Sequence, residues 1–143
     1  MERVRVGIGV MILSEGKILL GHRVNNYKDT GGIYEPGSWT FPGGKQELFE
    51  TIYEGAQREV KEETDLDISD IEIYTAIDDI GVDRHYVTIG CIANSFNGTI
   101  KVMEPDIIDE WKFFAFDELP ENIYSPTRNF LEYYMKKEGM KHE

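Results

Sequence analysis

The residues best suited to chemistry lie between positions 51 and 65: Arg58, Glu59, Glu62 and Glu63. This segment contains one glycine and no proline, and Thr51 followed by Glu54 has the form of a capping box, so we predict a helix from Thr51 to Asp65. At about 100° per residue, the three carboxylates fall within an arc of about 100° and can converge on one point. Such a cluster of hard oxygen donors is suited to binding a divalent cation.

The plain alternative is a solvated acidic helix face, which is the usual role of a run of charges. On the helical wheel, however, Glu63 lies between Ile52 and Ala56 of the apolar stripe, and Glu59 borders this stripe. Burying carboxylates this close together is costly unless a cation compensates their charge. Oxygen ligands without His or Cys favour Mg²⁺ or Mn²⁺ over zinc, and Mg²⁺ usually shares its ligand shell with substrate phosphates.

The elements that must position this helix are expected to be mainly strands. Runs rich in Val, Ile, Thr and Tyr predict strands at residues 3–13, 17–24, 39–41, 68–80, 84–96, 99–102 and 111–116. Asn97 and Gly98 form a two-residue hairpin signal before the sixth of these segments. We expect loops at residues 25–38 and from Pro42 to Thr51, and a closing helix at Ser125–Lys137. This pattern alone predicts a mixed α/β domain.

Composition indicates one globular domain over residues 1–143, with 41% hydrophobic residues and enough length to bury a core without disulfides. Cys91 is the only cysteine, which excludes a disulfide framework and fits a reducing compartment, so we expect a cytoplasmic protein. No apolar run approaches the ~20 residues of a membrane span. The net charge of −12 disfavours binding to a nucleic-acid polymer, and an acidic protein that handles phosphates is expected to recruit cations.

The charged helix is part of a longer motif. The residues that match the Nudix box, G x5 E x7 REU x EE x GU, at every spacing are Gly44, Glu50, Arg58, Glu59, Val60, Glu62, Glu63 and Leu66. The chain therefore resembles the Nudix hydrolase family. Asp65 replaces the last glycine of the box; because this position ends a helix, where a positive φ is often needed, aspartate is among the better substitutes. Flanking segments at residues 19–23, 37–44, 85–89 and 110–120 look most like the MutT-like branch that cleaves (deoxy)nucleoside triphosphates.

The resemblance implies a fold and a set of metal ligands. The expected fold is the Nudix α/β/α sandwich, with a mixed sheet between the box helix and the C-terminal helix. Glu59, Glu62 and Glu63, with the carbonyl of Gly43, are expected to hold Mg²⁺, or Mn²⁺ in its place, against a di- or triphosphate. The expected role of Arg58 is to position the box glutamates, including Glu50, by charge-assisted hydrogen bonds.

Other residues are expected to contact substrate or water. Gly44, with Gly43, lets the loop approach the ions closely. Arg23 is a candidate phosphate contact, although an exposed charge at a strand end is equally plausible. Thr88 is a candidate for the base pocket or an ordinary sheet position. One box glutamate, or Glu110, is expected to orient or deprotonate the attacking water. Acidic residues in the region of Glu104 complete the metal site in some relatives, so Glu104 is a further candidate, secondary to Glu110. His22 and His85 are interpreted as structural, and the aromatic residues that stack on a base or fill the core are Trp39, Phe113, Tyr124 and Phe130.

The leading functional prediction is a Mg²⁺-dependent pyrophosphohydrolase that releases nucleoside monophosphate and pyrophosphate from nucleoside triphosphates, for example in sanitising the nucleotide pool. Within the same chemistry, the alternative substrates are ADP-ribose and other nucleoside diphosphates linked to a second group. A Nudix-fold sensor that binds nucleotides without cleaving them is the alternative from a different class. A homodimer is also expected, because many small relatives are dimers. The sequence does not choose the base, the sugar or the general base.

Overall fold

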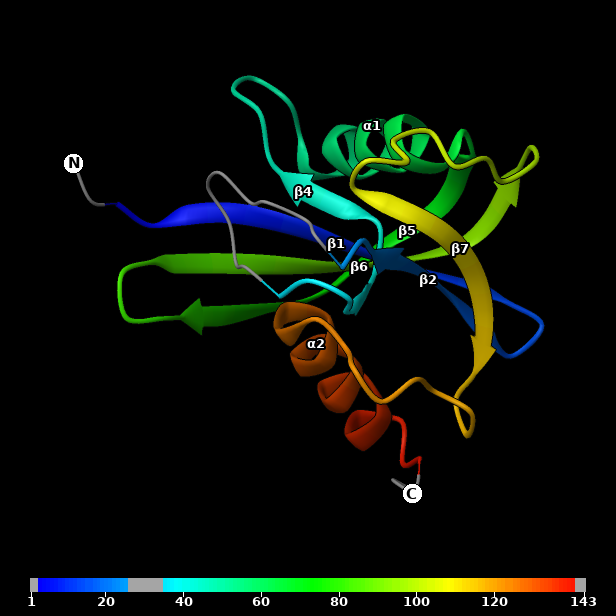
Figure 1. The fold of residues 1–143 in the computed structure, drawn as a ribbon. Helices are drawn as coiled ribbons and strands as arrows, with labels where there is room; N and C mark the ends of the chain where they lie inside the picture. Colours follow the sequence, from blue (N-terminus) through cyan, green and yellow to red (C-terminus); the bar gives the residue numbers. More distant parts are fainter. Residues whose placement is uncertain (1–2, 26–34, 141–143) are drawn as a thin grey trace.

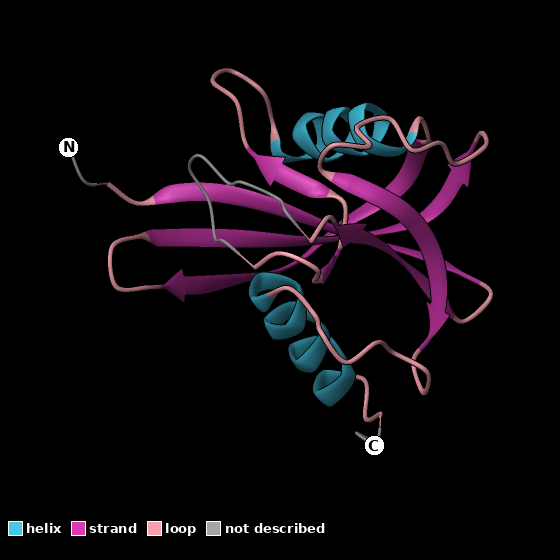
Figure 2. Ribbon diagram, viewed as in Figure 1, coloured by secondary structure: helices cyan, strands magenta, loops and turns pink. Residues whose placement is uncertain are grey.

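The computed structural model describes residues 3–25 and 35–140, and within them two helices cover a mixed sheet (Figure 1). In chain order the elements are β1 Arg5–Ser14, β2 Lys17–Arg23, β3 Trp39–Thr40, β4 Gly43–Lys45, α1 Ile52–Thr64, β5 Asp67–Ile80, β6 His85–Asn97, β7 Ile108–Ala115 and α2 Ser125–Lys137. Helices α1 and α2 lie on opposite sides of the sheet (Figure 2). The predicted α/β/α sandwich with a mixed sheet is therefore confirmed.

The sheet is centred on a parallel pair, in which β1 residues 5–12 lie beside β6 residues 86–93. The other pairings are antiparallel, and the strand order is β3-β2-β1-β6-β5, with β4 joined to β1 and β7 joined to β2. Residues 7–9 of β1 pair with β4, whereas residues 13 and 14 pair with β2. Strand β1 therefore uses its two halves for different partners, and the segment just before α1 is held against the sheet by β4.

The core has two layers because the side chains of β1 alternate between the faces of the sheet. Ile8, Val10 and Ile12 are buried in the layer beneath α1. Met11 points to the other face and is buried with Phe130 of α2. The predicted alternation in this strand thus holds, and it fixes α1 and α2 on opposite faces.

Both ends of α1 are closed by the residues predicted for them. The Thr51 hydroxyl accepts a hydrogen bond from the Glu54 backbone N–H at 3.1 Å, and the Glu54 carboxylate accepts one from the Thr51 N–H at 2.8 Å. Asp65, at the C-cap, has a φ of 67° and donates its backbone N–H to the carbonyl of Lys61. The capping box and the left-handed C-cap are therefore confirmed. No helix in the described part of the chain is long and apolar enough to cross a membrane.

Two local predictions are wrong. The segment 99–102 is not a strand: β6 ends at Asn97, Gly98 turns the chain at a φ of 108°, and the Lys101 N–H donates to the carbonyl of Thr64. These residues therefore cover the end of α1 instead of pairing with β6. Gly43, expected in a loop, belongs to β4, where it approaches β1 so closely that a Cβ atom would lie 1.9 Å from the Ile8 carbonyl oxygen.

Two other boundaries differ from the prediction. The strand expected at residues 111–116 begins earlier, at Ile108, because Ile108 already pairs with Arg23 across a bulge in the ladder with β2. Of the loop predicted at residues 25–38, residues 26–34 lie outside the described residues. Its last part turns back toward β2, since the Arg23 N–H donates to the carbonyl of Ser38 at 2.8 Å.

Phe49, in the loop before α1, combines a φ of 70° with a side chain that is 97% exposed. A left-handed conformation costs a residue with a Cβ atom roughly 1–2 kcal/mol, and glycine avoids this cost. Phe49→Gly is therefore expected to raise the free energy of unfolding by about 1 kcal/mol, measured by urea denaturation. The matched control is Leu48→Gly, because Leu48 is 83% exposed and is not among the residues with positive φ. A less stable Phe49→Gly variant would show that the phenyl ring makes a stabilising contact.

Candidate active site

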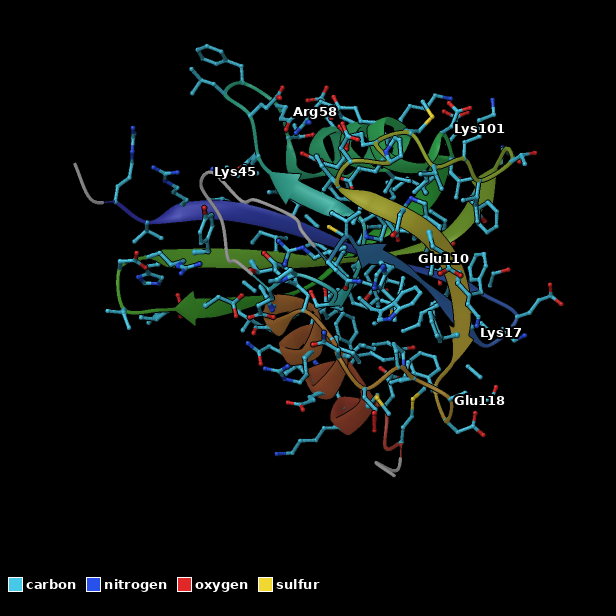
Figure 3. All side chains as sticks on the ribbon, in the orientation of Figure 1. Lys17, Lys45, Arg58, Lys101, Glu110 and Glu118 are labelled. Carbon is cyan, nitrogen blue, oxygen red and sulfur yellow. The ribbon has the colours of Figure 1, made fainter. Side chains whose placement is uncertain are left out.

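Arg58, on α1, is the centre of the charged network. Its Nε and Nη2 atoms donate to the two carboxylate oxygens of Glu50 at 2.9 and 2.7 Å. Its Nη1 atom donates to Glu59 at 3.1 Å and to Glu62 at 3.2 Å, and Nη2 also donates to the carbonyl of Lys45 at 3.1 Å. One guanidinium thus ties the loop before α1 to two carboxylates of the helix (Figure 3 labels Arg58 and Lys45). Arg58 thus contacts Glu50, Glu59 and Glu62, and its positioning role stays a prediction.

Glu50 is held as an anion by this network. Its side chain is only 14% exposed. The hydrogen bonds from Arg58, followed by one from the Glu47 backbone N–H at 2.8 Å, lower the pKa of Glu50 from 4.5 to about 2, against the opposing effect of burial. The same bonds raise the pKa of Arg58. Bidentate, charge-assisted bonds of this kind fix geometry as well as charge, so the loop and the helix form one rigid unit.

Glu63 has the opposite electrostatic environment. Burial raises its pKa well above 4.5, and a hydrogen bond with Glu59 and the negative charges of Glu59 and Glu104 raise it further; only a 3.4 Å hydrogen bond from the Gly43 N–H acts in the other direction. The pKa of Glu104 is also raised, first by burial and then by the charges of Glu59 and Glu62. Several carboxylates thus meet where the ionised form is disfavoured, which is the expected environment of a cation-binding site.

Gly44 makes this packing possible. A Cβ atom at Gly44 would lie 2.4 Å from an oxygen of Glu59, so any larger residue would displace that carboxylate. Glu59 in turn links the two halves of the cluster, since it contacts both Arg58 and Glu63. Substitution of Gly44 would therefore disturb Arg58 and Glu63 together.

The donor set fits a hard divalent ion such as Mg²⁺. Glu59, Glu63 and the nearby Glu104 offer only oxygen, and their mutual repulsion is the kind that a cation removes. Within residues 3–25 and 35–140, no three His, Cys, Asp or Glu side chains form a ready-made metal cluster. Glu62 instead bonds to Arg58, so its side chain would have to turn from Arg58 to join the other carboxylates.

A cavity of about 440 Å³ extends from these carboxylates across the sheet toward α2. Glu63, Glu104 and the backbone of β4 line one end. The rest is lined by side chains and backbone of β1, β2, β6 and α2: Gly7, Gly9, Arg23, Tyr86, Thr88, Tyr124, Thr127 and Phe130. The cavity therefore has an acidic end at Glu63 and Glu104 and a largely neutral section toward α2.

Arg23 lines this cavity and is only 5% exposed, so the alternative of an exposed charge at a strand end is wrong. Its guanidinium lies 4.2 Å from the centre of the Tyr124 ring, and its Nη1 donates to the carbonyl of Glu35 at 3.3 Å. The Glu35 carboxylate also accepts from the N–H and the hydroxyl of Ser125 at the start of α2. Arg23 is thus held between β2 and α2, beside the space open to a ligand.

Glu110 does not lie with the other candidate residues. It borders a separate depression with His22, Trp39 and Asp109, and Figure 3 shows it on β7 apart from Arg58. The physical reason is strand alternation: Trp111 packs into the layer beneath α1, so the preceding side chain points to the other face. Of the two later acidic candidates, the one that borders the cavity is Glu104, which the sequence analysis placed second. A role for Glu110 in the reaction has no geometric support.

The two histidines left out of the site are each paired with an aspartate. His22 Nδ1 lies 2.8 Å from Asp109, and His85 Nε2 lies 2.8 Å from Asp78. Neither histidine lines the cavity. The four aromatic candidates fall into two groups. Tyr124 and Phe130 line the cavity, whereas Trp39 and Phe113 pack in the core.

Comparison with known protein families identifies the family of this chain. A family model described as the NUDIX domain matches residues 3–134, nearly the whole chain. The chain belongs to the Nudix family. The box helix is thus α1, and the box glutamates are those gathered around Arg58.

Nudix structures from bacteria superpose on the chain over most of its length. A MutT Nudix hydrolase from Burkholderia pseudomallei is 32% identical, with a TM-score of 0.82 over 92% of this chain and 98% of that one. The E. coli ORF135 protein is 22% identical, with a TM-score of 0.76 over 96% of this chain and 92% of its own, which shows a shared fold. Nudix hydrolase 5 of Arabidopsis thaliana is 35% identical over 69 residues, or 48% of this chain and 22% of its own length. The chain thus spans about a fifth of the curated relatives it matches.

Proposed function

We propose that this Nudix domain is a Mg²⁺-dependent pyrophosphohydrolase that cleaves (deoxy)nucleoside triphosphates to nucleoside monophosphate and pyrophosphate. The observation that carries the proposal is Glu63, whose ionised form is disfavoured and which contacts Glu59, at the edge of a cavity of about 440 Å³. A divalent ion there would neutralise phosphate charge as the anhydride bond breaks. The residues proposed to hold it are Glu59, Glu62, Glu63 and the Gly43 carbonyl.

The other residues of the cavity fit the remaining parts of a nucleoside triphosphate. Lys45, on β4, lines the acidic end and provides positive charge for phosphate oxygens, whereas Arg23, beside Tyr124, is proposed to contact phosphate only where the chain of phosphates extends toward α2. Gly7 and Gly9 add no side chains to the floor of this section, beside Tyr86 and Thr88, and so leave room for a flat base. A nucleotide can thus place its phosphates at the acidic end, with the bound cation, and its base toward α2.

Glu104 is proposed to accept the proton of the attacking water. Its carboxylate borders the cavity beside Glu63, and burial and neighbouring carboxylates raise its pKa, which brings a carboxylate closer to the range of an effective general base. In this step the water oxygen bonds to phosphorus, the anhydride P–O bond breaks and pyrophosphate leaves. Glu104 takes the water proton, and Arg58 keeps Glu59 in position meanwhile.

The proposal is tested by a substrate panel at neutral to alkaline pH with Mg²⁺, in which pyrophosphate and phosphate release are scored separately. The panel contains (d)NTPs, oxidised dNTPs, ADP-ribose and a UDP-sugar, and each reaction is repeated with excess EDTA. We expect one or a few triphosphates to give monophosphate plus pyrophosphate, and EDTA to stop the reaction. Dominant cleavage of ADP-ribose or the UDP-sugar would overturn the substrate assignment, and nucleotide binding without turnover would identify a sensor.

A further inference from the structure

Thr88 of β6 uses its only proton within the protein. Its hydroxyl donates to the Asp79 carboxylate with an oxygen–oxygen distance of 2.6 Å. A threonine hydroxyl has one proton and two lone pairs, so once the proton is committed the oxygen can only accept. Thr88 lines the cavity, and its Oγ1 lies 4.0 Å from where a Cβ atom of Gly7 would stand, on the floor of the neutral section. This hydroxyl therefore faces the ligand space as a hydrogen-bond acceptor.

A second hydrogen bond, from helix α2, holds the Asp79 carboxylate in place. It is 7% exposed at the edge strand β5, and its other carboxylate oxygen accepts from the Asn129 side-chain amide of α2 at 2.8 Å. The carboxylate thus joins β5, β6 and α2, with one oxygen committed to each donor. Because it has no proton to give when ionised, it holds both Thr88 and Asn129 as donors toward itself.

The other two threonines that line the cavity, Thr40 and Thr127, also form hydrogen bonds within the protein. The Thr40 hydroxyl donates to the carbonyl of Phe41 at 2.9 Å. The Thr127 oxygen accepts from the Phe41 N–H at 3.0 Å and lies 3.3 Å from the Thr40 oxygen. Either of the two hydroxyls can be the donor in that last contact. Thr40 and Thr127 therefore both have hydrogen-bond partners within the protein, while the Thr88 proton is held by a carboxylate that can only accept when ionised.

We propose that Asp79, acting through Thr88, makes the cavity select nucleobases that carry an exocyclic amino group over their keto counterparts. An amino group donates to the Thr88 hydroxyl oxygen. A keto oxygen placed against Thr88 instead leaves two acceptors, the keto oxygen and the Thr88 oxygen, unpaired in a buried site. The resulting preference is expected to be about tenfold or more in affinity. This inference rests on the proposed function only in that the ligand is a nucleotide. Asp79 is a positioning residue here, because it reaches the base through Thr88.

Asp79→Asn is the most informative variant because it can reverse the direction of the hydrogen bond between residue 79 and Thr88 while keeping the shape of the side chain. If Asn129 keeps its amide group toward position 79, the new side-chain oxygen accepts from Asn129, and the new amide group faces Thr88 and donates to it. The Thr88 hydroxyl is then free to donate into the cavity. We expect the ratio of affinities for the amino and keto members of a pair to fall by about tenfold and to move toward the keto base. Thr88→Val removes the hydroxyl and is expected to abolish the preference without reversing it.

The measurement is equilibrium binding of CMP against UMP and of AMP against IMP by calorimetry, on the full chain. Asp78→Asn is the matched control, because Asp78 is the neighbouring carboxylate on β5, is 64% exposed and pairs with His85 outside the cavity. A purely structural Asp79 would weaken all four nucleotides equally, and this result would overturn the inference. So would equal wild-type affinity for both members of each pair. Wild-type amino selectivity without turnover of any triphosphate would instead overturn the proposed function and leave this inference standing.

Discussion

Glu63→Gln is expected to lower kcat by more than about 100-fold while leaving the folded protein at least as stable as wild type in metal-free buffer. The loss follows because a proposed metal ligand loses its charge, and even residues that only support ligands contribute 10- to 100-fold. The stability follows from the raised pKa of Glu63, which shows that the fold disfavours its ionised form. Glutamine keeps the shape and can still accept the hydrogen bond from the Gly43 N–H.

The measurement pairs steady-state kinetics with thermal denaturation in EDTA. Glu132→Gln is the control, because it removes the same charge from an exposed position on α2. Two results would contradict the assignment. Turnover close to wild type would show that Glu63 is no ligand. A large fall in melting temperature would show that the carboxylate stabilises the fold, and then the lost activity would not report on metal binding.

The elements that the sequence predicts well are those whose signals are local. The capping box of Thr51 and Glu54 lies within one helical turn, and Asp65 needs only its own backbone conformation to end α1. The motif that joins Glu50 to Arg58 spans one loop and two turns of helix, so its spacing alone brings the two side chains together. The alternation in β1 likewise depends only on successive residues.

The parts that were missed depend on distant contacts. Gly98 looks like a hairpin residue, but the contact between Lys101 and the end of α1 decides where the chain goes next. Glu104 and Glu110 are six positions apart and chemically equivalent, but Glu104 lies in the loop before β7 and borders the cavity, whereas the pairing of β7 with β2 places Glu110 elsewhere. Asp79 reaches Asn129 across 50 positions, and no spacing rule connects them. A polar network of this kind joins elements that only the packing of the sheet and α2 brings together, so the local sequence pattern does not indicate it.

The ion pair between Glu50 and Arg58 is expected to make stability depend on pH. The pKa of Glu50 falls from 4.5 to about 2 on folding, so the pair stabilises the fold fully above pH 4.5 and loses its effect as the pH falls toward 2. This shift of about 2.5 units corresponds to about 3 kcal/mol. We therefore expect wild type to exceed Glu50→Gln in free energy of unfolding by about 3 kcal/mol more at pH 6 than at pH 2. Urea denaturation with EDTA present, at several pH values, measures this difference.

Glu47→Gln separates this buried pair from ordinary surface charge. Glu47 also approaches Arg58, at 3.5 Å, but its side chain is 64% exposed, so its pair is expected to contribute no more than about 1 kcal/mol. If both variants showed the same small dependence on pH, Glu50 would be no more than a surface partner of Arg58. A large effect at Glu50 alone means that the bond between Glu50 and Arg58 stabilises the fold strongly. Glu50 then holds the Arg58 guanidinium in the position from which it contacts Glu59 and Glu62. Glu50 and Glu59 then keep their places in the metal-free protein, whereas Glu62 leaves Arg58 only when a cation draws it to the other carboxylates.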